Sequence, residues 1–122
     1  MTPDDFMDLA AGIGPDVQRK PVLDTVQYRV GAKVFATLGW PAEGWAVVKL
    51  NAGDQRKALA TSNAFAREPG RRRNSGVTLI HLKTVDPAML AEVLGAAWRQ
   101  AYLGSGRAGA VQASRGAQLD AG

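Results

Sequence analysis

The chain has 122 residues, of which 46% are hydrophobic, and this is enough for one folded core. It contains no cysteine, which excludes disulfide bonds and thiolate zinc sites. With 15 Lys and Arg against 11 Asp and Glu, the formal net charge is +4. The first residues, MTPDD, are unlike a secretory signal and no apolar run is long enough to cross a membrane, so we expect a cytoplasmic protein without a membrane partner.

Hydrophobic periodicity and turn residues predict the secondary structure. In chain order, the predicted elements are a helix over 3–13, strands over 26–30, 33–38 and 45–50, a helix over 52–61, a loop over 67–76, a strand over 77–82 and a helix from Asp86-Pro87. Residues 62–65 are interpreted as a further turn of the second helix. The last helix has the clearest apolar stripe, because its apolar residues recur at helical spacing. The stripe consists of Leu90, Val93, Leu94, Ala97, Trp98 and Ala101.

These elements predict an α+β fold of the two-layer sandwich type. An antiparallel sheet would carry the helices on one face and leave its other face partly open. From residue 103 the composition changes to Gly, Ala, Ser, Gln and Arg, which bury too little apolar surface to offset the entropy of ordering. The sequence therefore predicts one domain over 1–102 and a flexible Gly/Ala-rich tail over 103–122.

Two short motifs and the order of the elements after them point to a known family. Residues 29–36 read RVGAKVFA and residues 47–50 read VVKL; a helix, a Pro-Gly-Arg loop, a strand and a terminal helix follow. This pattern resembles the MmcQ/YjbR family of small bacterial proteins. The resemblance implies a secretion-chaperone-like α/β fold and a DNA-binding role, with no agreed enzymatic activity.

The loop over 67–76 is the strongest local charge feature. Its basic residues are Arg67, Arg71, Arg72 and Arg73. A guanidinium group matches two phosphate oxygens at once, and a Gly-flanked loop adapts to a groove, so this segment is a candidate for phosphate contacts. The alternative is an ordinary solvated surface loop.

A second group of basic residues falls on or next to the predicted strands. It consists of Arg29, Lys33, Lys49, His81 and Lys83. If the register aligns them, they form a basic platform on the open sheet face, where Phe35 or Trp45 would add stacking for single strands. The alternative is an exposed face kept soluble, and protected from edge pairing, by Lys and Arg.

Catalytic and metal-binding patterns are not found in the sequence. His81 is the only histidine, so a site with two histidine ligands is excluded. Nothing places a nucleophile and an orienting acid beside His81, as general-base catalysis requires. We therefore expect a non-catalytic module without a cofactor.

The function predicted from these residues is nucleic-acid binding, with DNA as the partner. The candidate binding residues are Arg29, Lys33, Lys49, Arg67, Arg71, Arg72, Arg73 and Lys83. One alternative is a protein-interaction or homodimerisation domain of chaperone-like fold, and the expected state is a monomer or a homodimer. A second alternative is a small-molecule binder or enzyme with a cleft around Lys49 and His81.

Overall fold

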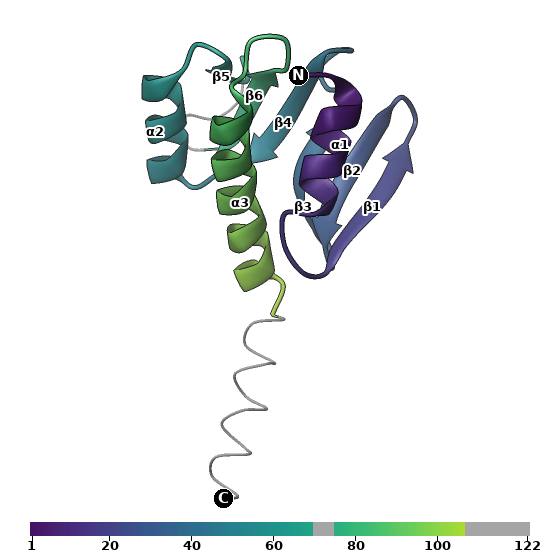
Figure 1. The fold of residues 1–122 in the computed structure, drawn as a ribbon. Helices are drawn as coiled ribbons and strands as arrows, with labels where there is room; N and C mark the ends of the chain where they lie inside the picture. The colour runs from purple at the N-terminus through teal and green to yellow at the C-terminus, as the bar shows by residue number, and fades with distance from the viewer. Residues whose placement is uncertain (70–74, 107–122) are drawn as a thin grey trace, which may run out of the picture.

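The computed structural model describes residues 1–69 and 75–106 (Figure 1). Its strands are β1 (Val17–Val22), β2 (Thr25–Val30), β3 (Lys33–Leu38), β4 (Trp45–Lys49), β5 (Phe65–Arg67) and β6 (Val77–His81). They form one antiparallel sheet in the order β1-β2-β3-β4-β6-β5. The helices are α1 (Pro3–Ala11), α2 (Ala52–Thr61) and α3 (Pro87–Gly104). All three lie on one side of the sheet (Figure 1), which confirms the predicted two-layer α+β sandwich.

The side of the sheet that faces the helices forms the core. Tyr28 pairs with Ala36 and Val48 pairs with Thr78 across neighbouring strands, and these four side chains are all buried. The predicted apolar stripe of α3 packs on this layer and is buried, apart from Trp98, which is partly buried against the core. Because side chains alternate along a strand, the residues between these positions lie on the open face.

Two strands are absent from the sequence-based prediction. β1 has four consecutive exposed residues, so it lacks the alternation of apolar and polar positions by which a half-buried strand is found. β5 has three residues, and the interpretation of 62–65 as helix is wrong, because α2 ends at Thr61 and Phe65 begins β5. Both are edge strands, held mainly by hydrogen bonds to one neighbour.

The two chain ends differ slightly from the prediction. The first helix ends at Ala11 instead of residue 13. After it, the backbone N–H of Gly12 donates back to the carbonyl oxygens of Asp8 and Ala10. The last helix continues to Gly104, two residues beyond the predicted domain boundary at 102. The remainder of the predicted tail, from 107, lies outside the described residues. No helix in the described part of the chain is long and apolar enough to cross a membrane.

A buried amide fixes α2 to the sheet. The side chain of Gln55 is only 3% exposed, and its Nε2 donates to the carbonyl of Val77 at 3.2 Å and to Oγ1 of Thr78 at 3.0 Å. The Thr78 hydroxyl in turn donates to the carbonyl of Gly76 at 3.2 Å. A buried amide is stable only when it is paired in this way, so the network sets the position of α2 over the start of β6.

The hydroxyl of Tyr28 is a buried polar group without a hydrogen-bond partner among the described residues. An unpaired buried hydroxyl costs about 1–3 kcal/mol, so Tyr28→Phe is expected to raise the free energy of unfolding by about 1 kcal/mol at neutral pH. Urea unfolding of both proteins measures the difference. A loss of stability in Tyr28→Phe would mean that the hydroxyl is hydrogen-bonded in solution.

Tyr28 also makes the stability of the fold depend on pH in the alkaline range. Burial raises the pKa of Tyr28 above the usual value for tyrosine; nearby Arg19 lowers it and Asp8 raises it. In the unfolded chain Tyr28 therefore ionises first, and folding stability falls as the pH rises above about 10 towards the folded-state pKa. Tyr28→Phe should reduce this alkaline loss, and an unchanged pH dependence would contradict the assignment.

Candidate nucleic-acid interface

The antiparallel register gathers four of the predicted binding residues at one end of the sheet. β2 ends there, β3 begins there, β4 ends there, and β5 ends beside the start of β6. The cross-strand pairs at this end are Arg29↔Val34, Val30↔Lys33, Lys49↔Val77 and Arg67↔Thr78. We call this end of the sheet the basic end, and its basic residues are Arg29, Lys33, Lys49 and Arg67.

These four side chains do not form the flat platform expected from the sequence. Arg29 and Lys49 lie on the open face, two strands apart, which corresponds to roughly 10 Å at the usual strand spacing. Lys33 pairs with the buried Val30 and therefore lies on the helix side of the sheet. Arg67 also belongs to the helix side, because its partner Thr78 is buried there. The basic end consequently wraps around the end of the sheet.

The other two members of the predicted platform, His81 and Lys83, lie at the opposite end of the sheet. His81 pairs with Trp45, four residues before Lys49, so His81 and Lys49 are about 13 Å apart along the strands. Lys83 lies in the turn after β6, at this same opposite end. The register therefore does not align His81 and Lys83 with Arg29 and Lys49, so the condition for the basic platform is not met.

The aromatic residues proposed for base stacking are not available in that role. Phe35 is 1% exposed and belongs to the core. Trp45 is partly buried and packs against His81 in a tilted arrangement, with ring centroids 4.6 Å apart. The Nδ1 atom of His81 also lies 3.2 Å from the Thr84 hydroxyl. The basic end therefore has cations but no exposed aromatic platform in the described part of the chain.

The arginine run at 71–73 lies outside the described residues, so its predicted role in phosphate contacts has no structural account. The residues on either side of the gap are placed. Arg67 ends β5 and Val77 begins β6 next to Lys49, so both flanks of the segment lie at the basic end.

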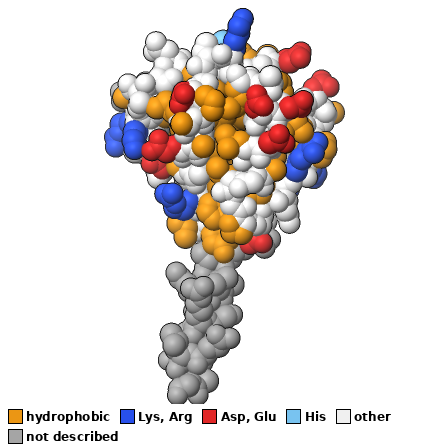
Figure 2. All heavy atoms as spheres, viewed as in Figure 1, with side chains coloured by type: hydrophobic (Ala, Val, Ile, Leu, Met, Phe, Trp, Pro, Cys, Tyr) orange, Lys and Arg blue, Asp and Glu red, His pale blue; other side chains and the backbone are white. Residues whose placement is uncertain are grey.

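Acidic and basic residues are unevenly distributed between the strands and the helices of the described fold. The strands contain no Asp or Glu, and their Lys and Arg residues are Arg19, Lys20, Arg29, Lys33, Lys49 and Arg67. The helices hold Asp4, Asp5, Asp8, Asp54 and Glu92 beside Arg56, Lys57 and Arg99. Figure 2 shows this helix side, with acidic side chains spread over its upper half. The sheet is therefore the positive layer of the molecule.

Two acidic residues lie close to the basic end in the chain. Asp16 precedes β1 and Glu68 follows β5; both of them, and Arg67, have interaction partners within the protein. In contrast, neither Lys33 nor Lys49 forms an ion pair with a described residue. The charge of these two exposed lysines is thus not neutralised by neighbouring acids of the described chain.

Arg29 is held against the open face. Its Nη2 donates to Oε1 of Gln27 at 2.7 Å, and both side chains are partly buried. Its Nε is buried without a hydrogen-bond partner among the described residues. Gln27 is neutral, so the guanidinium keeps its full charge while its orientation is restricted, which favours binding of a phosphate by the remaining N–H groups.

A cavity of about 540 Å³ lies at the basic end, between the start of β3, the end of β4 and the last turns of α3. Its charged lining residues are Lys33 and Lys49, and Gln100 of α3 adds a neutral amide. This cavity is not predictable from the sequence. It depends on where the β3–β4 ladder stops, and residue type alone does not determine that position.

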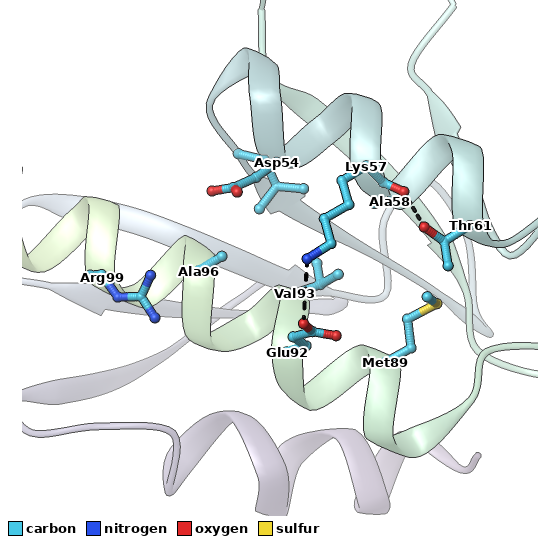
Figure 3. A pocket seen from close by; sticks show the side chains of 10 residues that line it. Asp54, Lys57, Ala58, Thr61, Met89, Glu92, Val93, Ala96 and Arg99 are labelled. Carbon is cyan, nitrogen blue, oxygen red and sulfur yellow. Dashed lines mark hydrogen bonds and ion pairs between the residues drawn. The ribbon is translucent and has the colours of Figure 1, made fainter.

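A second cavity, of about 240 Å³, lies between α2 and α3 (Figure 3). Lys57 reaches from α2 across it to Glu92 on α3, with Nζ and Oε1 3.7 Å apart. Asp54 and Arg99 also line this cavity, so its two acids balance its two bases. It therefore has no net attraction for a phosphate, unlike the cavity at the basic end.

A metal centre and the cleft considered around Lys49 and His81 are not formed by the described residues. No group of three or more His, Asp or Glu side chains is placed to hold a metal ion in the part of the chain that the structure covers. The cleft envisaged around Lys49 and His81 is not formed, since these residues lie at opposite ends of β4 and β6 and the Lys49 cavity is not lined by His81.

Comparison with known proteins agrees with the resemblance found in the sequence. No curated protein sequence matches the chain. The family model described as YjbR matches residues 14–100, which include every strand of the sheet, α2 and most of α3. Because this match covers well over half of the 122 residues, the chain belongs to the YjbR family.

Proposed function

We propose that the protein is a non-catalytic cytoplasmic module that binds the phosphate backbone of nucleic acid, DNA in the first place, at the basic end of its sheet. The observation that carries this proposal is the meeting of Arg29, Lys33 and Lys49 at one end of strands that contain no acidic residue. A phosphate backbone presents closely spaced negative charges, and its affinity for proteins comes largely from such cations.

The geometry favours contacts to phosphates over contacts to bases. Lysine ammonium groups act as point charges, and Arg29 offers a planar fork to phosphate oxygens. The expected mode is therefore binding with little dependence on base sequence.

A salt titration tests the proposal. Fluorescence anisotropy with labelled duplex DNA, single-stranded DNA and RNA should give binding at low salt that weakens steadily as salt is added. If Arg29, Lys33 and Lys49 each neutralise one phosphate, log K against log salt on duplex DNA should have a slope of roughly −3. Absence of binding at low salt, or binding that is insensitive to salt, would overturn the proposal.

A second candidate function, homodimerisation, is favoured by the opposite end of the sheet. Leu23, in the β1–β2 turn, is 99% exposed, and Trp40, in the β3–β4 turn, is 47% exposed. Both line one hollow of about 710 Å³. Large exposed apolar side chains that gather in one place are typical of interaction surfaces. Sedimentation velocity over a range of concentrations tests this, with Leu23→Ser expected to shift a dimer towards monomer.

A further inference from the structure

The cavity at the basic end is formed by an irregularity in β3. Tyr28 pairs with Ala36 and Arg29 with Val34, so Phe35 is an extra residue in β3, a β-bulge. The β3–β4 pairing extends only from Leu38 back to Ala36. The first three residues of β3 therefore have no pairing partner on β4, and the space between them and the end of β4 opens under the last turns of α3.

Small and apolar residues line most of this space. They are Ala32, Val34, Phe35, Ala97, Ala101 and Gly104. Phe35, Ala97 and Ala101 are buried, so they form a fixed wall. A volume of about 540 Å³ falls within the usual size range of a small-molecule site.

The polar part of the lining is positively charged. Lys33 and Lys49 approach the cavity from two strands and from the two faces of the sheet. The stem of Lys33 lies over the end of α3, where a Cβ added at Gly104 would be 3.7 Å from its Cε. The carbonyl end of a helix repels anions, so Lys33 also offsets the negative end of the α3 dipole. An anion in this cavity would therefore depend on both lysines.

We propose that the cavity binds an organic phosphate monoester of nucleotide size, with the phosphate between the Lys33 and Lys49 ammonium groups and the organic part against Ala97 and Ala101. Lys33 and Lys49, with no acidic residue in the cavity lining, match a phosphate monoester, whose charge is about −1.5 to −2 at neutral pH. The ligand is either a free nucleotide or the phosphorylated end of a strand, and the second source rests on the function proposed above.

Calorimetric titration of the full chain with adenosine 5′-monophosphate tests the proposal, with adenosine and inorganic phosphate as separate probes. The monophosphate should bind at least fivefold more tightly than either probe. Lys33→Gln and Lys49→Gln should each weaken it at least fivefold, as should Gln100→Glu, which adds an acid to the lining. Lys83→Gln, at the opposite end of the sheet, has the same charge change as the lysine variants and should leave the affinity unchanged.

A second arm distinguishes the source of the phosphate. A single-stranded oligonucleotide with a 5′-phosphate should bind at least threefold more tightly than the same strand with a 5′-hydroxyl if strand ends are the ligand. Equal binding of these strands, together with tight binding of the monophosphate, assigns the cavity to free nucleotides.

The failures of the two proposals are separable. Salt-dependent binding of long duplex DNA without any binding of the monophosphate overturns the cavity proposal and leaves the phosphate-backbone function standing. Tight binding of the monophosphate without duplex binding overturns the phosphate-backbone function and leaves the cavity proposal standing. Equal affinity for inorganic phosphate and the monophosphate, or an equal effect of Lys83→Gln, also overturns the cavity proposal. Thermal unfolding of each variant confirms that the exposed substitutions leave the fold intact.

Discussion

Gly76→Ala is expected to lower the free energy of unfolding by about 3 kcal/mol. Gly76 has a φ of +76°, and a Cβ at this position would lie 2.1 Å from the carbonyl oxygen of Leu50. The backbone N–H of Leu50 also bonds to the Gly76 carbonyl at 2.9 Å. Since neither backbone segment can move without breaking this contact, the overlap must separate β4 from the start of β6.

Gly44→Ala is the matched control for this prediction. Gly44 has a similar φ of +86°, but a Cβ there would have no atom within 4 Å. Its expected cost is therefore only the conformational one, about 1 kcal/mol. Urea unfolding of both variants measures the difference, and equal losses would show that the contact with Leu50 is not tight in solution.

Lys49→Glu and Lys33→Glu are each expected to weaken binding to duplex DNA at least tenfold at low salt. Each removes one phosphate contact and places a carboxylate where the backbone would lie. The slope of log K against log salt should become shallower by about 1 for each variant. The loss should be similar for unrelated base sequences, because the contacts proposed here are made to phosphates.

Lys83→Glu provides the matched control, because it changes the net charge by the same amount at the opposite end of the sheet. Its effect should stay below about threefold, reflecting only the long-range field, which salt screens. If all three variants weakened binding equally, net charge alone would explain the affinity, and the basic end would have no special role.

The central part of the fold is predictable from sequence because its signals are local. β2, β3 and β4 have apolar residues suited to a sheet with one buried face, and Gly31-Ala32 provides the connection between two of them. α3 combines an Asp86 cap with a long apolar stripe. β1 lacks such a pattern, and its two-residue connection to β2, Leu23-Asp24, contains no glycine or asparagine of the kind that marks a tight hairpin turn in a sequence.

The candidate site is less predictable because it depends on the register and the strand order. The sequence identifies Arg29, Lys33 and Lys49 as candidates, but only the pairing of β2, β3, β4 and β6 brings them to one end and sends Lys83 to the other. The bulge at Phe35 puts Lys33 on the helix side, against simple alternation. A one-residue shift in register exchanges the two faces of a strand, so such placements cannot be obtained from residue type alone.

The buried hydrogen bonds of Gln55 and Thr78 also help to position the candidate site. In the sequence Gln55 and Thr78 are two polar residues that fall in a predicted helix and a predicted strand. In the fold they hold α2 against β6, one residue from the pairing of Lys49 with Val77. The positions of the cations at the basic end therefore rest on a polar contact in the core as well as on the sheet ladder.

Amide chemical-shift mapping during titration with a short duplex DNA is the most direct test of the central claim, and a 12.9 kDa protein suits it well. If DNA binds at the basic end, the largest shifts will fall at residues 29–35, 49–50 and 76–78. Residues 23–24, 40–44 and 82–84, at the opposite end, should change little. Shifts concentrated at that opposite end, or on the helices, would show that the basic end is not the DNA-binding surface.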